Sequence, residues 1–84
     1  MKEHDLIALG FDKEVVIKEE SGCVRDYHYY IYDFTEQLAL MSNDSEEAEG
    51  KGWYVEFYDV ENEIRFTNIR ELAKLITIIE NAKI

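Results

Sequence analysis

Residues 25–43 read RDYHYYIYDFTEQLALMSN and predict the centre of the fold. The first part, 25–34, is dominated by aromatic side chains and is typical of a long strand. Residues 37–43 predict a second strand, which a tight connection near Thr35 and Glu36 joins to the first. The two strands are therefore expected to form a hairpin.

Further strands are predicted on both sides of this hairpin. Residues 13–19 are rich in β-branched side chains and end at Ser21-Gly22, a pair typical of a turn. Residues 53–59 alternate with the period of two that a half-buried strand requires. A turn at 61–63 and a short strand at 64–66 are expected to follow. The inward side chains of 53–59 would be Trp53, Val55 and Phe57.

The chain ends in a predicted amphipathic helix. Asn68, followed three positions later by Glu71, is a capping box, in which each side chain accepts a hydrogen bond from a backbone N–H of the first turn. Apolar residues then recur at helical spacing, namely Ile69, Leu72, Leu75, Ile76 and Ile79. Near the N-terminus, an apolar patch ahead of Gly10 predicts a short helical turn, because glycine readily takes the left-handed conformation that ends a helix.

These elements predict one α+β domain covering residues 1–84. It would consist of an antiparallel sheet of four to five strands, with the C-terminal helix packed on one face and a short N-terminal helix. The length of 84 residues, with 46% apolar and 13% aromatic side chains, fits a compact domain rather than a disordered chain.

Negative charge is concentrated in the middle of the chain. Residues 33–63 contain ten acidic residues and one basic residue, and the net charge of the whole chain is −10. Such a field repels nucleic acid and anionic membranes and attracts a basic partner. Four of these acids, with Ser45 and two glycines, fall within residues 44–52. That composition favours a mobile loop.

Strand 25–34 has aromatic side chains on both of its faces. The two alternating sets are His28, Tyr30, Tyr32 and Phe34, and Tyr27, Tyr29 and Ile31. One helix covers only one face of a sheet, so one set is expected to be exposed or only partly covered, beside Tyr54 and Tyr58. Two interpretations stay open: cross-strand packing pairs, or a protein interface, where tyrosine is enriched.

Direct binding of nucleic acid is not expected. Aromatic rings on a sheet resemble single-strand platforms, but those platforms add a positive groove that follows the phosphates. Around the tyrosines only Arg25 and Lys51 are basic. A smaller basic group, Arg65, Arg70 and Lys74, is interpreted as a solvated face.

Neither a metal site nor catalysis is expected, and no cofactor is predicted. The acids of 44–49 lack the spacing of a calcium-binding loop, and weak binding of a divalent cation by Asp44, Glu46, Glu47 and Glu49 stays open as the lesser alternative to a solvated loop. His28 with Asp26 lacks the third His or Cys partner of a zinc site. An enzyme would depend on Cys23 as nucleophile, with His28 nearby in the sequence as its base.

The sequence predicts a cytoplasmic protein. A single cysteine closes no intramolecular disulfide, and no apolar run approaches the roughly 18 residues that span a bilayer. Residues 1–5 are charged and show no signal-peptide pattern behind them.

Three segments resemble small acidic proteins of bacteriophages and mobile elements. They are Leu9-Gly10-Phe11, Trp53-Tyr54-Val55-Glu56-Phe57 and Phe66-Thr67-Asn68-Ile69-Arg70-Glu71-Leu72-Ala73-Lys74-Leu75-Ile76. The resemblance implies a setting in which such proteins act as non-enzymatic inhibitors of host or defence machinery, including anti-CRISPR proteins that occupy nucleic-acid channels. A phage-encoded protein of this kind would be found in the cytoplasm of the host cell.

The leading hypothesis is a non-enzymatic binding module, a monomer or homodimer, that docks on a basic, nucleic-acid-binding surface of another protein. Acidic side chains would steer the partner and tyrosines would anchor it. The predicted partner-binding residues are Tyr27, Tyr29, Asp44, Glu46, Glu47, Glu49, Tyr54, Glu56 and Tyr58. The alternative is a structural protein that self-associates through the tyrosine-rich face of the sheet.

Overall fold

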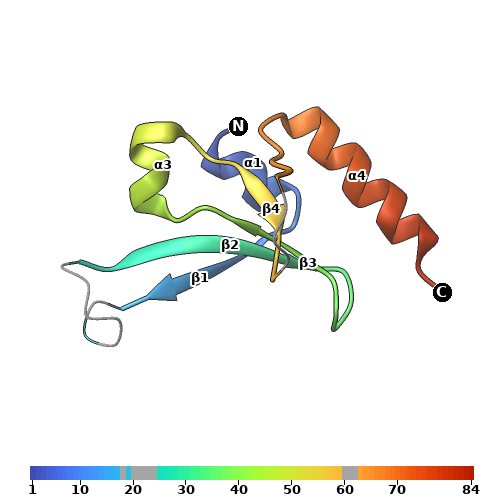
Figure 1. Cartoon of the computed structure of the whole chain (residues 1–84), viewed down its shortest axis with the longest axis horizontal. Coiled ribbons are helices and arrows are strands. Elements are labelled where there is room, and N and C mark those ends of the chain that lie inside the picture. Colours follow the sequence, from blue (N-terminus) through green and yellow to red (C-terminus); the bar gives the residue numbers. More distant parts are fainter. Residues whose placement is uncertain (18, 20–24, 60–62) are drawn as a thin grey trace.

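The computed structural model describes residues 1–17, 19, 25–59 and 63–84. It has an α+β architecture, as predicted, with an antiparallel sheet, a C-terminal helix and a short N-terminal helix (Figure 1). The elements follow the chain as α1 (Glu3–Ala8), β1 (Asp12–Val16), β2 (Tyr27–Asp33), β3 (Ala39–Ser42), α3 (Ser45–Lys51), β4 (Val55–Phe57) and α4 (Ile69–Ala82).

The four strands form one antiparallel sheet in the order β1-β2-β3-β4. The central hairpin turns at residues 34–38, where the Phe34 N–H donates to the Leu38 carbonyl at 2.9 Å. The Thr35 hydroxyl accepts from the N–H groups of Gln37 and Leu38, both at 3.1 Å. Because the turn satisfies its own backbone groups, the hairpin predicted from 25–43 forms, with shorter strands than expected.

The core lies between the sheet and the helices. Its buried cluster consists of Leu6, Phe11, Tyr30, Phe34, Leu40, Val55, Leu72 and Ile76. Trp53 and Phe57 pack against it as half-buried side chains, and so do Leu75 and Ile79 of α4. The predicted packing of the C-terminal helix against the face that contains Val55 is therefore confirmed.

The predicted N-cap of α4 and the predicted end of α1 are confirmed, but only the Asn68 half of the capping box is seen among the described contacts. At the start of α4, Oδ1 of Asn68 accepts from the N–H groups of Arg70 at 2.9 Å and Glu71 at 3.3 Å. After α1, Gly10 has a φ of +96° and its N–H donates to the Ile7 carbonyl at 3.1 Å. A side chain at that φ would be strained, so glycine suits the position.

Residues 45–51 form helix α3, so the prediction of a mobile loop at 44–52 is wrong. Asp44 caps this helix by accepting from the Glu47 N–H at 2.8 Å. Acidic side chains in the first turn and Lys51 in the last turn suit the helix dipole. The prediction gave too much weight to polarity, because Glu, Ala and Lys are strong helix formers and Gly52 comes only after the helix.

The prediction of a short strand at 64–66 is also wrong. Phe66 instead meets β4 through one isolated bridge, in which Phe66 and Val55 exchange two backbone hydrogen bonds of 3.0 and 2.8 Å. The turn predicted at Ser21-Gly22, most of the turn predicted at 61–63, and Cys23 lie outside the described residues.

Candidate functional site

Alternation along β2 divides its aromatic side chains between two environments. Tyr30 points into the core, where it is 1% exposed, whereas Tyr27 and Tyr29 project from the opposite face. Figure 1 shows α1, α3 and α4 above the sheet, and none of the described helices lies below it. We call this uncovered side the open face. By register and alternation it carries Glu14, Val16, Tyr27, Tyr29, Ile31, Met41 and Glu56.

A depression of about 520 Å³ lies on the open face, at the end where β3 leads into α3. Its lining combines tyrosine rings with carboxylates, and consists of Val16, Tyr27, Tyr29, Met41, Ser42, Asn43, Asp44, Glu47, Glu56 and Tyr58. Among these described lining residues three are acidic and none is basic. Aromatic faces and carboxylates together are suited to hold a cation.

The structure brings most of the predicted partner-binding residues together around this depression. The predicted residues that line the depression are Tyr27, Tyr29, Asp44, Glu47, Glu56 and Tyr58. The other three, Glu46, Glu49 and Tyr54, are engaged in contacts of their own. The segment 44–49 therefore does not present its four acids as one surface.

The tyrosines of the depression differ in exposure. Tyr27 and Tyr29 are half-buried, whereas Tyr58 is 51% exposed. Burial raises the pKa of Tyr29, and the negative charge of Glu14 raises it further. Both effects favour the neutral phenol, in which the hydroxyl can donate a hydrogen bond.

Tyr54 is buried, at 9% exposure, although it was expected beside the exposed tyrosines. Its hydroxyl donates to Oε1 of Glu47 at 2.5 Å, and the Arg65 guanidinium lies 4.2 Å from the ring centroid. Burial and this hydrogen bond raise the pKa of Tyr54 to about 12. The expectation failed because contacts from Glu47 of α3 and from Arg65, which strand alternation does not predict, cover the ring.

Arg65 makes two contacts near the open face that the sequence analysis missed. Besides its position over Tyr54, its Nε lies 3.6 Å from Oε1 of Glu56. The interpretation of Arg65 as part of a solvated basic face is thus wrong in part, since the side chain is 55% exposed but its guanidinium covers a ring. Arg65 directly precedes Phe66, whose bridge to Val55 brings this part of the chain beside β4, and the sequence pattern gave no signal of that pairing.

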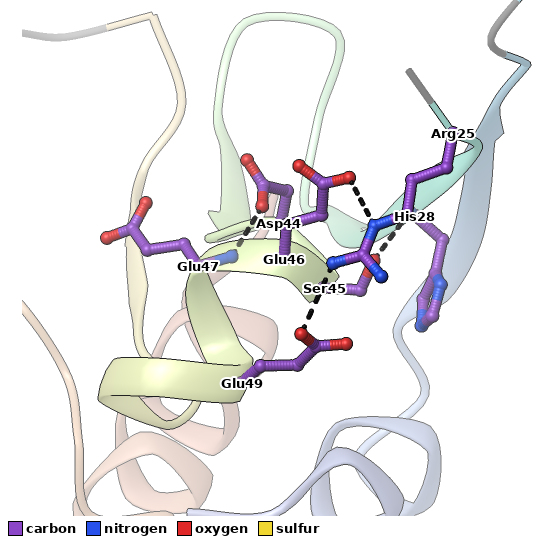
Figure 2. A network of polar contacts seen from close by, with 7 residues as sticks. All are labelled: Arg25, His28, Asp44, Ser45, Glu46, Glu47 and Glu49. Atoms are coloured by element: carbon purple, nitrogen blue, oxygen red, sulfur yellow. Dashed lines mark hydrogen bonds and ion pairs between the residues drawn. The ribbon is translucent and has the colours of Figure 1, made fainter. Parts of the chain in front are cut away.

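Helix α3 divides its acidic side chains between two directions (Figure 2). The Arg25 guanidinium donates to Glu46 at 2.9 Å and to Glu49 at 3.3 Å. Its hydrogen bond to Glu46, followed by the charge of Glu49, raises the pKa of Arg25. Figure 2 shows Glu47 pointing away from this group, because it is offset by one position on the helix. Glu46 and Glu49 therefore contribute to a separate, internally paired surface.

Three polar side chains hold α3 and the strand that leads into it, and sequence reasoning assigned none of them a role. The Ser42 hydroxyl accepts from the Tyr30 N–H at 2.9 Å, and the Ser45 hydroxyl accepts from the His28 N–H at 3.0 Å. The buried Asn43 amide donates to the Gly52 carbonyl at 2.8 Å and accepts from the Tyr54 N–H at 3.0 Å. These bonds close the 43–54 connection and place Glu47 at the depression.

A second polar cluster lies on the core side of the sheet. Oε2 of Glu3 accepts from the Tyr30 hydroxyl at 2.5 Å and lies 2.6 Å from Nε2 of His28. The Tyr30 hydrogen bond lowers the pKa of Glu3, and burial raises the pKa of Tyr30 to about 12. The Trp53 ring packs against both His28 and Tyr30, with ring centroids 5.9 and 5.5 Å apart. This cluster joins α1 to β2.

The described parts of the chain contain no group of three or more His, Cys, Asp or Glu side chains arranged to hold a metal ion. His28, considered above as a zinc ligand or as a base for Cys23, makes its contact with Glu3. Cys23 lies outside the described residues. His28 therefore links strand β2 to helix α1.

No family model matches this chain, and neither a curated protein nor a solved structure is significantly similar to it. The candidate site is therefore defined by its own geometry alone. Within the described residues, none of the helices is both long and apolar enough to cross a bilayer.

Proposed function

We propose that the protein is a non-enzymatic binding module whose open face docks on a basic surface of another protein. The observation that carries the proposal is the depression of about 520 Å³, where tyrosine rings and three carboxylates converge. Tyrosine contributes a large contact area at a small entropic cost, and an acidic wall raises the local concentration of cationic groups. The tyrosines would anchor the partner and the carboxylates would steer it.

We infer further that the partner's surface is one that binds nucleic acid. Such surfaces are basic because phosphate contacts dominate their affinity. A chain of net charge −10 with an acidic depression complements a surface of this kind. Occupying it would make the protein an inhibitor of a host or defence protein, as the resemblance to acidic phage proteins implies.

Charge disfavours self-association through the same face. A symmetric contact would place the carboxylates of Glu47 and Glu56 near those of a second copy, and like charges in a closed interface are destabilising. Docking on a basic protein is therefore the better-supported function.

Affinity capture from a bacterial lysate tests the proposal with three baits. They are the wild type, a Tyr29→Leu/Glu56→Gln double variant of the open face, and a matched Glu36→Gln variant in the exposed turn. We expect one basic, nucleic-acid-binding protein on the wild type and on the Glu36→Gln control, released by salt and by single-stranded nucleic acid. The open-face variant should lose it.

Two results would reject the proposed function. Equal retention of that protein by all three baits would show that the open face makes no contribution. A dimer that forms with concentration in sedimentation, and that the open-face double variant abolishes, would support self-association instead. Thermal melts of the three baits control for loss of the fold.

A further inference from the structure

We propose that the depression on the open face is a receptor for one arginine side chain of the partner. The inference rests on the proposed function and specifies which cationic group the acidic surface recognises. The chain already holds one guanidinium beside the depression, and the depression itself is lined by tyrosine rings and carboxylates.

The protein's own Arg65 shows how this surface accommodates a guanidinium. Its Cζ lies 4.2 Å from the centroid of the Tyr54 ring, and its Nε lies 3.6 Å from Oε1 of Glu56. Glu56 also lines the depression. The same carboxylate therefore borders both the place that Arg65 occupies and the neighbouring hollow.

The depression offers the same two kinds of group to a second guanidinium. Tyr27 and Tyr29 lie two positions apart on β2 and project from one face, and Tyr58 reaches the depression from the end of β4. A planar guanidinium stacks on such rings while its N–H groups reach flanking carboxylates. Glu47 and Glu56 supply those carboxylates.

The two carboxylates keep acceptor capacity beyond the contacts that they make within the chain. Oε1 of Glu47 accepts from the Tyr54 hydroxyl, and a carboxylate offers about four lone-pair sites in total. The 3.6 Å between Arg65 and Glu56 is longer than the usual limit of about 3.2 Å for an N–H···O hydrogen bond. Asp44 adds negative charge, although its Oδ1 already accepts from the Glu47 N–H.

Arginine fits this site better than lysine. A lysine ammonium is a compact and strongly hydrated charge, whereas a guanidinium is planar, more weakly hydrated and carries five donors. Stripping water from the guanidinium against half-buried rings is therefore less costly. Nucleobases also stack on tyrosine, but their phosphates would meet the three carboxylates of the lining.

The test is an NMR titration of the isotope-labelled chain with three capped amino acids, which carry no charged termini. They are the Nα-acetyl methylamides of arginine, lysine and citrulline, the last of which has nearly the shape of arginine without its charge. We expect millimolar binding of the arginine probe, with shifts confined to the open face, at least about threefold weaker binding of lysine, and no saturation with citrulline.

Two variants and a matched control locate the site. Tyr29→Leu removes a ring and Glu56→Gln removes a carboxylate of the depression, and each should weaken the arginine probe at least about threefold. Glu49→Gln changes the net charge by the same amount as Glu56→Gln, but Glu49 lies on α3 and pairs with Arg25, outside the lining of the depression. This control should bind the arginine probe as the wild type does.

The outcomes separate this inference from the proposed function. Equal binding of the lysine and arginine probes overturns the assignment to arginine. Shifts away from the open face, or equal effects of Glu49→Gln and Glu56→Gln, overturn the receptor. In either case, capture of a basic protein through the open face would still support the proposed function. Specific arginine binding without any captured protein would support the receptor and reject the protein partner.

Discussion

Two buried tyrosines, on opposite faces of the sheet, each donate a hydrogen bond from the hydroxyl to a carboxylate at 2.5 Å. Tyr30 donates to Glu3 and Tyr54 donates to Glu47. Each bond joins a residue in or next to a strand to a helix, and each phenol has its pKa raised to about 12, first by burial. At the scale of the residue, each hydroxyl is one of the polar links that join the sheet to a helix.

The Glu3 carboxylate should make the free energy of unfolding depend on pH in the acidic range. The Tyr30 hydroxyl lowers the pKa of Glu3 below its ordinary value of 4.5, with a further contribution from His28. The unfolded chain therefore binds this proton first on acidification. The Glu3 contribution is complete above pH 4.5 and is lost as the pH falls through the lower, folded-state pKa.

Urea unfolding of the wild type and Glu3→Gln across this range checks the expectation. The stability difference between the two proteins should be largest near neutral pH and should shrink below pH 4.5. Glu36→Gln, in the exposed turn, is the control and should show a small, constant difference. A Glu3→Gln difference that stays constant into strong acid would contradict the lowered pKa.

Tyr54 should make the free energy of unfolding depend on pH in the alkaline range. Its folded-state pKa of about 12 lies above the ordinary value of 10, so its contribution is complete below pH 10 and is lost as the pH rises toward 12. The loss of stability between pH 10 and 12 should therefore be smaller in Tyr54→Phe than in the wild type. Glu47→Gln should reduce this loss less, because burial is the larger cause. Urea midpoints that fall in parallel for all three proteins would refute this.

At the scale of the element, α3 is the part of the site that depends most on its caps and contacts. Seven residues form only about two turns, and helices this short are marginal on their own in water. Asp44 caps the helix, the Ser45 hydroxyl bonds to β2, and Arg25 joins Glu46 and Glu49. Tertiary contacts therefore stabilise a helix that local propensity only permits.

Asp44→Ala should weaken this element. Loss of an N-cap typically costs about 1 kcal/mol, in a range of roughly 0.5–2 kcal/mol. We expect the free energy of unfolding to fall by that amount. Amide hydrogen exchange should become faster than in the wild type, and more so in 45–51 than in α4. Glu36→Ala, an exposed change outside any helix, should stay within about 0.5 kcal/mol of the wild type. Equal exchange rates in α3 of both variants would show that the cap is unimportant.

At the scale of the whole molecule, the two faces of the sheet have different roles. The helix side is closed by apolar packing that includes Leu72 and Ile76 of α4. The open face has tyrosine rings and carboxylates at its surface and is not covered by a described helix (Figure 1). The hydrophobic core and the candidate site thus lie on opposite faces, so Tyr29 and Glu56 of the site can be altered without removing the core.

Two isoleucines of α4 test this division. Ile76 is 8% exposed and belongs to the core, whereas Ile78 is 65% exposed on the same helix. Ile76→Ala should cost about 2–5 kcal/mol, a large part of the roughly 5–8 kcal/mol expected for a domain of this size. Its melting temperature should fall by about 8 °C or more, while Ile78→Ala should melt within about 3 °C of the wild type. Equal melting temperatures would contradict the packing of α4 on the sheet.

The sequence by itself determined the features that are local. The hairpin of 25–43, the cap at Asn68 and the alternation of β2 follow from neighbouring residues, because strand and helix periods fix which side chains share a face. Tyr27, Tyr29 and Glu56 were therefore placed at the candidate site from sequence alone.

Only the tertiary structure decided the features that depend on distant residues. Glu3 reaches Tyr30 across 27 positions and Arg25 reaches Glu46 across 21. Tyr54 is contacted by Glu47 of α3 and by Arg65, which lies between β4 and α4. Composition predicted a loop at 44–52, but contacts made across the fold form a helix there. The physical reason is that burial and pairing depend on which elements meet in space, and periodicity describes one element at a time.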